Sequence, residues 1–129
     1  MKRMVLMGFA ALLLTACQET LEERCARETR EYTEKNCPTL VGRGVTLDSM
    51  TFDVATHTIS YLYTLEGVLD DSAIVNANNP RERLLMEVKN NTHLKLYKEA
   101  DYSFRYVYFS TKNNGTQLFE ATFHANDYQ

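Results

Sequence analysis

The stretch Phe104–His124, FRYVYFSTKNNGTQLFEATFH, decides the fold. Two runs of alternating apolar and polar residues flank Asn114-Gly115, the dipeptide favoured at the centre of a type I′ turn. This pattern predicts a β-hairpin in which the numbers of paired residues sum to 229, as 114 and 115 do. One face of the hairpin carries six apolar or aromatic side chains and should face the core: Phe104, Tyr106, Tyr108, Phe119, Ala121 and Phe123.

The opposite face of the hairpin mixes charged residues with three apolar ones, Val107, Phe109 and Leu118. Such a sheet face is usually covered by a helix, and we expect the N-terminal helix to cover it through Leu21 and Tyr32. If that helix packs elsewhere, the three apolar residues form a candidate binding surface for a partner protein or a second copy of the chain.

Further strands precede and include the hairpin. Segments rich in β-branched and aromatic residues predict strands at 45–54 and 58–65, and then at 93–98, 102–111 and 116–124. Within the first strand the apolar residues change parity halfway along. A β-bulge would reconcile the two halves, and we place it near Asp48 and Ser49.

Between these two groups of strands, residues 68–91 follow a helical period. Asp70, Asp71 and Ser72 are suited to cap a short first turn, and Asn79-Pro80 reads as the N-cap and first residue of a longer helix. The predicted fold class is therefore α+β. We expect an N-terminal helix, then a ββαβββ order that forms an antiparallel sheet with a helix packed on one face.

The N-terminal helix is expected within residues 19–35, where oppositely charged residues repeatedly stand four apart. Its apolar stripe is thin. We expect a lipid-anchored helical spacer at 17–36 ahead of a single α+β domain at 37–129. The alternative is a solvated helix that rests lightly on the domain.

The first residues have the layout of a secretory signal peptide. A basic start, Met1–Arg3, is followed by the uncharged run Met4–Leu14. As a helix those eleven residues would span only about 16 Å, well short of the roughly 30 Å hydrocarbon core of a bilayer. We therefore expect residues 1–16 to be removed as a signal peptide.

The segment Leu14-Thr15-Ala16-Cys17 resembles the lipobox of bacterial lipoproteins. The resemblance implies that Cys17 carries a diacylglyceryl thioether and becomes the acylated first residue of the mature chain. Two or more acyl chains anchor a protein stably. We therefore expect this protein in the bacterial cell envelope, held on the outer membrane through Cys17.

Cys25 and Cys37 are the only other cysteines. The cell envelope permits disulfides, and we expect a bond between them if the helix ends by about Thr33. A helix unbroken to Lys35 would place their Cα atoms too far apart, and then both thiols stay free.

The charge of the chain argues against nucleic acid as a partner. The net charge is −3, and removal of residues 1–16 takes away Lys2 and Arg3 and no acid, which leaves −5. Nucleic-acid recognition needs clustered lysine and arginine. We expect the membrane, and a protein partner or a second copy, as the binding partners.

Little in the sequence predicts chemistry. The histidines His57, His93 and His124 are the only candidates for a neutral-pH base, and none stands at metal-ligand spacing from another ligand residue. The serines lack a nucleophile elbow. We therefore expect no catalytic residues, no metal and no cofactor.

Two Tyr-x-Tyr pairs, Tyr61 with Tyr63 and Tyr106 with Tyr108, each point to one side of a strand. They either pack in the core with their hydroxyls at the sheet rim or form an aromatic surface for a sugar or peptide. Together with Cys37-Pro38, Val41, Thr46–Ser49, Thr64 and Phe104, they resemble a family of small uncharacterised exported bacterial proteins. The resemblance covers residues 37 to about 124 and implies fold and location only.

The leading hypothesis is a non-enzymatic, lipid-anchored binding or accessory module of the cell envelope. One alternative is an envelope hydrolase that gathers histidines and carboxylates from distant strands. The other is an inhibitor of a secreted hydrolase, whose mark would be a rigid exposed loop at Lys112–Gly115.

Overall fold

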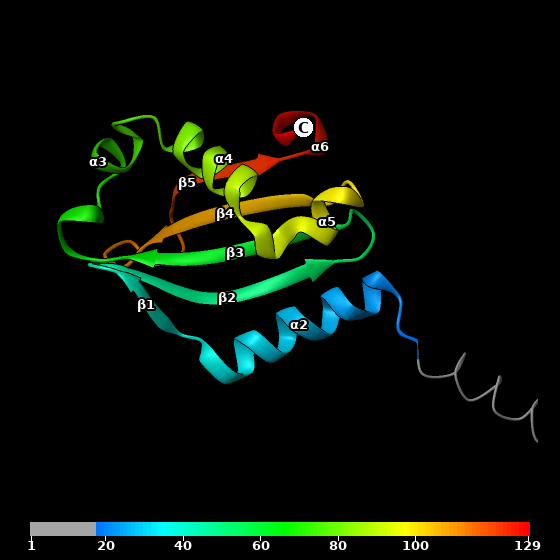
Figure 1. Ribbon diagram of the computed structural model, residues 1–129. Helices are drawn as coiled ribbons and strands as arrows, with labels where there is room; N and C mark the ends of the chain where they lie inside the picture. Colours follow the sequence, from blue (N-terminus) through cyan, green and yellow to red (C-terminus); the bar gives the residue numbers. More distant parts are fainter. Residues whose placement is uncertain (1–17) are drawn as a thin grey trace, which may run out of the picture.

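The sheet of this protein has five strands. The computed structural model describes residues 18–129, so the expected signal peptide and Cys17 lie outside the described residues. Neighbouring strands follow the chain order across the sheet (Figure 1). They are β1 (Thr39–Gly42), β2 (Val45–Asp53), β3 (Thr58–Leu65), β4 (Ser103–Ser110) and β5 (Gln117–Phe123).

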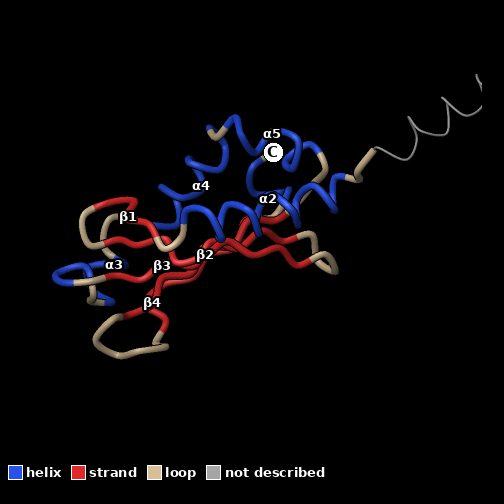
Figure 2. Tube along the Cα trace, turned by 90° about the horizontal axis from the view of Figure 1, so that it is seen from below, coloured by secondary structure: helices blue, strands red, loops and turns tan. Residues whose placement is uncertain are grey.

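The helices lie between the strands and at both ends of the described chain. Figure 2 shows α2, α4 and α5 on one side of the sheet. The expectation of an α+β fold, with an N-terminal helix and a helix packed on the sheet, is confirmed. The helical elements are α2 (Leu21–Asn36), η1 (Gly67–Leu69), α3 (Ser72–Asn76), α4 (Pro80–Asn90), η2 (Thr92–Leu94), α5 (Lys95–Glu99) and α6 (Ala125–Tyr128).

One strand pair differs from the expected antiparallel sheet. β3 and β4 run parallel, with Ile59 opposite Phe104 and Leu65 opposite Ser110, whereas the other three pairs are antiparallel. The chain between β3 and β4 contains α3, α4 and α5 and returns along the helical side to the starting end of β3. A connection of that length allows a parallel crossover, which a tight turn does not.

The strand expected at residues 93–98 is instead helical. Leu94 and Tyr97, which stand three apart, are 7% and 5% exposed, and Leu96 between them is 46% exposed. This spacing is that of a helix face, and the segment forms η2 and α5. The prediction of a strand at 93–98 is therefore wrong. The sheet still has five strands because it contains β1, a strand that the sequence did not predict.

The β-bulge expected near Asp48 and Ser49 is confirmed. Leu47 pairs with Tyr63 and Ser49 with Leu62, so Asp48 is the extra residue in β2. The bulge keeps Leu47 and the later apolar residues of β2 on the same face of the sheet.

The β4–β5 hairpin forms with a longer loop than expected. Tyr106 pairs with Ala121, so paired numbers sum to 227 rather than 229. A type I′ turn needs a positive φ at both central residues, and of the two only Gly115 has one, at 85°. The shift of two residues leaves the side chains of Phe104–Tyr108 and Phe119–Phe123 on their predicted faces, and the register shifts once more where Phe109 pairs with Gln117.

Helix α2 packs on the core side of the sheet, not on the face that carries Val107. Cys25 is completely buried in the main core cluster, and Leu21 packs against that cluster. The hydroxyl of Thr33 accepts a hydrogen bond from the Met50 N–H (2.9 Å) and donates one to the Met50 carbonyl (3.0 Å). The expectation that α2 covers the opposite face is therefore wrong.

The expected disulfide is absent, since Cys25 and Cys37 are free. Helix α2 does not end near Thr33 but continues to Asn36, and the Cys37 N–H still donates to the Thr33 carbonyl (3.1 Å). The continuous helix carries Cys25 and Cys37 too far apart for a disulfide.

Candidate functional site

An open groove runs over the helical face of the sheet, between α2 and the connection that contains α4 and α5. Its larger section has a volume of about 520 Å³, within the usual range for ligand sites. Strands β2 and β3 form its floor. The residues lining it are Cys25, Glu28, Thr29, Tyr32, Leu47, Met50, Ile59, Tyr61, Tyr63, Asn91, His93, Leu94 and Tyr97.

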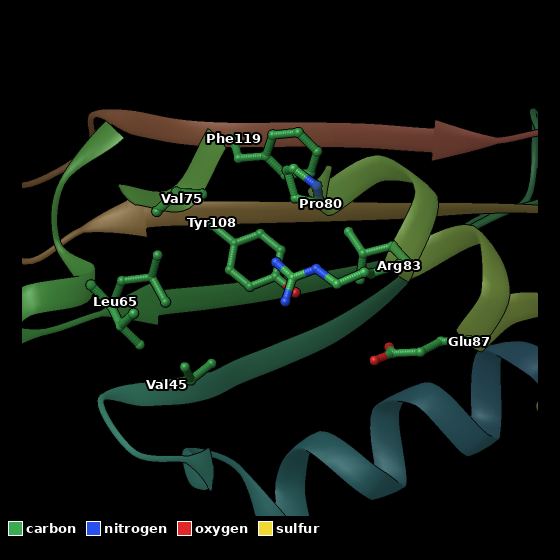
Figure 3. A pocket seen from close by; sticks show the side chains of 10 residues that line it. Val45, Leu65, Val75, Pro80, Arg83, Glu87, Tyr108 and Phe119 are labelled. Atoms are coloured by element: carbon green, nitrogen blue, oxygen red, sulfur yellow. The ribbon is translucent and has the colours of Figure 1, made fainter. Parts of the chain in front are cut away.

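A smaller section of about 280 Å³ lies beside α3 and α4 (Figure 3). Tyr63 lines the larger section and stacks on Tyr108, which lines the smaller one. The two sections share no lining residue and adjoin through this stacked pair, and we call them together the tyrosine groove. The residues lining the smaller section are Val45, Leu65, Leu69, Val75, Pro80, Arg83, Leu84, Glu87, Tyr108 and Phe119.

The parallel register of β3 and β4 creates the tyrosine layer of this groove. It places Tyr61 beside Tyr106 and Tyr63 beside Tyr108. The rings stack at 4.8 and 4.6 Å between centroids, with planes only 10° and 8° apart. Such offset aromatic pairs add to the stability gained from burial and hold the side chains in fixed orientations.

Three of the four tyrosines, Tyr61, Tyr63 and Tyr108, line the tyrosine groove, whereas Tyr106 lines neither section and is 5% exposed. Among the described residues none of the four hydroxyls makes a hydrogen bond with the protein, yet no fully buried side-chain polar atom lacks a partner. Each hydroxyl therefore retains some contact with solvent. Burial raises the pKa of all four, that of Tyr108 to about 12, so they are protonated donors at neutral pH.

One wall of the larger section is fixed by Glu28 of α2. Its carboxylate accepts hydrogen bonds from the Tyr97 hydroxyl (2.9 Å) and from Arg24 Nε (2.5 Å). Burial opposes the ionised form, but the bonds from Arg24 and Tyr97 outweigh it and hold the pKa of Glu28 below its ordinary value. The contact ties α2 to α5 across the groove.

The smaller section has an apolar wall and a charged mouth. Figure 3 shows Arg83 extending from α4 toward Tyr108, with Glu87 one turn further along the helix. Within residues 18–129 neither of these charged side chains forms an ion pair. Both are exposed and remain available to a polar group of a ligand.

The cysteine that lines the groove is not an activated nucleophile. Burial raises the pKa of the Cys25 thiol to about 12, so it is protonated at neutral pH. A thiol is reactive as the thiolate, and its environment here disfavours that form. Cys25 therefore acts in packing.

The three histidines are not brought into a catalytic arrangement. His57 Nε2 lies 2.8 Å from Glu22 Oε1, and its ring stacks on Tyr102. His93 lines the tyrosine groove, where Glu28 is already held by two donors.

His124 Nδ1 lies 2.8 Å from Ser103 Oγ, which is the one serine–histidine pair of the described residues. The nearby Asp127 carboxylate accepts from the backbone N–H of His124 (2.8 Å) rather than from its ring. A triad needs the carboxylate on the imidazole, so this arrangement caps α6 instead. No cluster of three metal-binding side chains is present in residues 18–129.

The candidate surface of Val107, Phe109 and Leu118 lies on the sheet face opposite the helices. Val107 is fully buried by its neighbours, and only Phe109 and Leu118 are partly exposed. No helix of the described chain covers this face in Figure 2. A ligand could therefore contact Phe109 and Leu118 but not Val107.

The sequence pointed to the tyrosines of the groove but not to its walls. The prediction of a strand at 93–98 hid the wall made by Leu94 and Tyr97. Their three-residue spacing was the available signal. Met50 and Leu47 were assigned correctly to one face of β2, but nothing local indicates that α2 stands beside them.

Comparisons with solved structures show the same fold in a protein described as secreted and in two pilotins of type 2 secretion systems. A protein of Pseudomonas aeruginosa described as secreted, PA3611, superposes with a TM-score of 0.66 at 12% identity, over 87% of this chain and 100% of that one. The type 2 secretion system pilotin EpsS of Vibrio vulnificus has a TM-score of 0.60 at 10% identity, over 84% and 92% of the two chains. The pilotin AspS of Vibrio cholerae gives 0.60 and 11%, over 83% and 91%.

None of the described helices is long and apolar enough to span a membrane. No curated protein sequence matches this chain significantly. The model of one sequence family, described as a domain of unknown function (DUF8479), matches residues 20–119. Because this match covers most of the chain, the protein belongs to the DUF8479 family.

Proposed function

We propose that this protein is a lipid-anchored accessory module of the bacterial cell envelope that binds a segment of a partner protein in the tyrosine groove. It catalyses no reaction. The observation that carries the proposal is an open, apolar groove whose tyrosine hydroxyls have no hydrogen-bond partner within residues 18–129. The fold that it shares with a secreted protein and with two type 2 secretion system pilotins supports an accessory role in the envelope.

The chemistry of the groove favours a peptide segment as its ligand. Leu47, Met50 and Ile59 offer apolar contacts, which suit apolar side chains. The hydroxyls of Tyr61 and Tyr63 are donors, which suit the carbonyl groups of a peptide backbone. A segment with apolar side chains and accessible carbonyls satisfies both.

The anchor in this proposal is Cys17. The lipobox-like segment Leu14–Cys17 supports removal of residues 1–16 and acylation of Cys17. Residues 17–36 then form the membrane-attached helical segment, and residues 37–129 the remainder of one α+β domain. An outer-membrane location is part of the same proposal.

The proposal is tested by photo-crosslinking in native membranes. We place a benzophenone side chain at Tyr32, on the rim of the groove and 39% exposed, and a control at Val68, which is 81% exposed outside it. A discrete crosslinked protein is expected from position 32 only. Tyr63→Phe should weaken this crosslink about threefold or more, because it removes one donor while keeping the ring.

Mass spectrometry of the same membranes gives the mass of the N-terminal peptide, which should begin at an acylated Cys17. An unacylated Cys17 would refute the anchor alone. Equal crosslinking from positions 32 and 68, or an unchanged yield in Tyr63→Phe, would refute the groove as the binding site. Thermal unfolding of each variant shows whether the fold is retained.

A further inference from the structure

A second cleft lies on the helix-free face of the sheet, under the β4–β5 loop, with a volume of about 720 Å³. We call it the hairpin cleft. It is separate from the tyrosine groove, because its strand residues point to the opposite face. The lining residues are Pro38, Thr46, Asp48, Thr64, Glu66, Phe109, Ser110, Thr111, Asn114 and Gly115.

Three of the hydroxyl groups around the hairpin cleft already donate their protons to acceptors within the protein. Thr64 donates to the Asp48 carboxylate, and Thr111 donates to the Leu65 carbonyl at 2.7 Å. Ser110 donates to Asp70 at 2.5 Å. The Thr64 and Thr111 hydroxyls therefore present lone pairs to a ligand, whereas Ser110 is 3% exposed and already accepts a hydrogen bond from the Asn113 N–H (3.0 Å). Thr46 and Asn114 are the only lining side chains left as donors.

The charge of the cleft has one sign. Asp48 and Glu66 are its two ionisable lining residues, and no lysine or arginine lines it. Neither carboxylate forms an ion pair within the part of the chain that the structure describes. A ligand that fits must bring hydrogen-bond donors and positive charge.

The aromatic ring of Phe109 favours a guanidinium group over an ammonium group as the positive charge of the ligand. It is the only aromatic lining residue and is partly exposed on this face. A guanidinium group is planar, stacks on an aromatic ring, and donates several hydrogen bonds to carboxylates in its plane. An ammonium group lacks the flat face that such stacking uses.

The wall of the cleft is held in place before any ligand arrives. The Asp70 carboxylate accepts from the N–H groups of Thr111 (3.0 Å) and Lys112 (2.8 Å). The base of the β4–β5 loop is closed by a hydrogen bond from the Ser110 N–H to the Thr116 carbonyl (2.9 Å). Preformed sites avoid the entropic cost of ordering a loop on binding.

We propose that the hairpin cleft holds an arginine side chain of a partner protein, with its guanidinium on the Phe109 ring and against the Asp48 and Glu66 carboxylates. This inference goes beyond the proposed function, since it assigns a second contact on the other face of the sheet. It does not depend on the tyrosine groove.

The test uses the full acylated protein in detergent micelles and NMR signals of Phe109 and Thr64. The probe is capped arginine, N-acetyl-argininamide, and the matched neutral probe is N-acetyl-citrullinamide. Saturable shifts are expected with the arginine probe, with a Kd on the order of millimolar, weaker binding of the capped lysine, and no saturable shift with citrulline.

Variants locate the contact. Glu66→Gln should weaken binding of the arginine probe about two- to fivefold, as expected for a partly exposed ion pair, and Phe109→Leu by a similar factor. Glu82→Gln changes an exposed acid on α4 and should have no effect. Tyr63→Phe should also leave the probe affinity unchanged, which separates this site from the tyrosine groove.

Equal shifts with arginine and citrulline probes would overturn the proposal, as would an unchanged affinity in Glu66→Gln. Saturable binding of N-acetylglucosamine in place of arginine would identify the cleft as a sugar site and would also overturn it. Unaltered signals from the core residue Phe104 in each variant show that the fold persists.

Discussion

Asp70 links two distant parts of the chain through a single carboxylate. It is 5% exposed and accepts hydrogen bonds from Ser110 Oγ and from the N–H groups of Thr111 and Lys112. The neighbouring Asp71, which is exposed, caps α3 instead. The sequence assigned both residues to the start of a helix, and nothing local distinguishes the one that reaches the hairpin.

The Asp70 contacts predict a specific dependence of stability on pH. The hydrogen bond from Ser110, followed by those from Lys112 and Thr111, lowers the pKa of Asp70 in the folded state. The ionised carboxylate therefore stabilises the fold above the unfolded-state pKa of about 3.9. That contribution is lost as the pH falls through the lower, folded-state pKa.

We expect Asp70→Asn to lower the urea midpoint at pH 7 and to reduce the loss of stability between about pH 5 and pH 3. Asp71→Asn is the matched control and should change little, because asparagine is as good an N-cap as aspartate. Urea titrations at several pH values check both. Parallel pH profiles for Asp70→Asn and the wild type would contradict the assignment.

At the scale of elements, helix α2 substitutes for a missing strand. β1 pairs with β2 only as far as Leu47. The backbone N–H and carbonyl of Met50, which point away from β3, therefore have no neighbouring strand to bond to. The Thr33 hydroxyl satisfies the N–H and the carbonyl of Met50. A buried, unsatisfied backbone group destabilises a fold, so this one side chain matters more than its size suggests.

Thr33→Val keeps the shape of the side chain and removes both hydrogen bonds to Met50. We expect a loss of about 1–2 kcal/mol in the free energy of unfolding. Thr29→Val is the control in the same helix, since its hydroxyl donates only to carbonyls of α2 itself, and a smaller loss is expected. Urea unfolding of the two variants measures the difference, and equal losses would show that the edge contact is unimportant.

The elements that could be predicted are those whose pattern is local. The alternation of β3 predicted its bounds, and the change of parity in β2 predicted the bulge at Asp48. The faces of the last hairpin were right although its loop was wrong, because an error of two residues preserves parity. In α5 the short sequence fits both periods, and only burial of Leu94 and Tyr97 selects the helix.

The candidate site was predictable only in part, for a related reason. The Tyr-x-Tyr pairs are visible in the sequence, but their stacking depends on the parallel pairing of β3 with β4. Strand direction across a long connection is not encoded in either strand. The hairpin cleft depends likewise on Asp70 and the β4–β5 loop, which are about forty residues apart in sequence.

At the scale of the whole molecule, the proposed anchor would fix the orientation of the domain. Three residues separate Cys17 from the start of α2 at Leu21, so the two Cα atoms lie at most about 14 Å apart. Figure 1 shows that α2 begins at the end of the sheet that carries the β2–β3 turn, while the β4–β5 loop lies at the opposite end. His57 in that turn contacts Glu22 of α2 at 2.8 Å.

We therefore expect the β2–β3 turn to face the bilayer and the β4–β5 loop to point away from it. In vesicles containing the acylated protein and a lipid-bound quencher, a fluorophore at Val54 should be quenched more strongly than one at Asn114. Both positions are exposed, so labelling should preserve the fold. Equal quenching would show that the domain tumbles freely on its tether.

The parallel pairing of β3 and β4 has a consequence for how the chain folds. Strands β3 and β4 can meet only after α3, α4 and α5 have been synthesised, because Ile59 pairs with Phe104. Distant pairings of this kind slow folding. A chain that crosses a membrane N-terminus first during its synthesis would therefore lack the β3–β4 pair. It could not form its compact fold until nearly all of its residues had been translated.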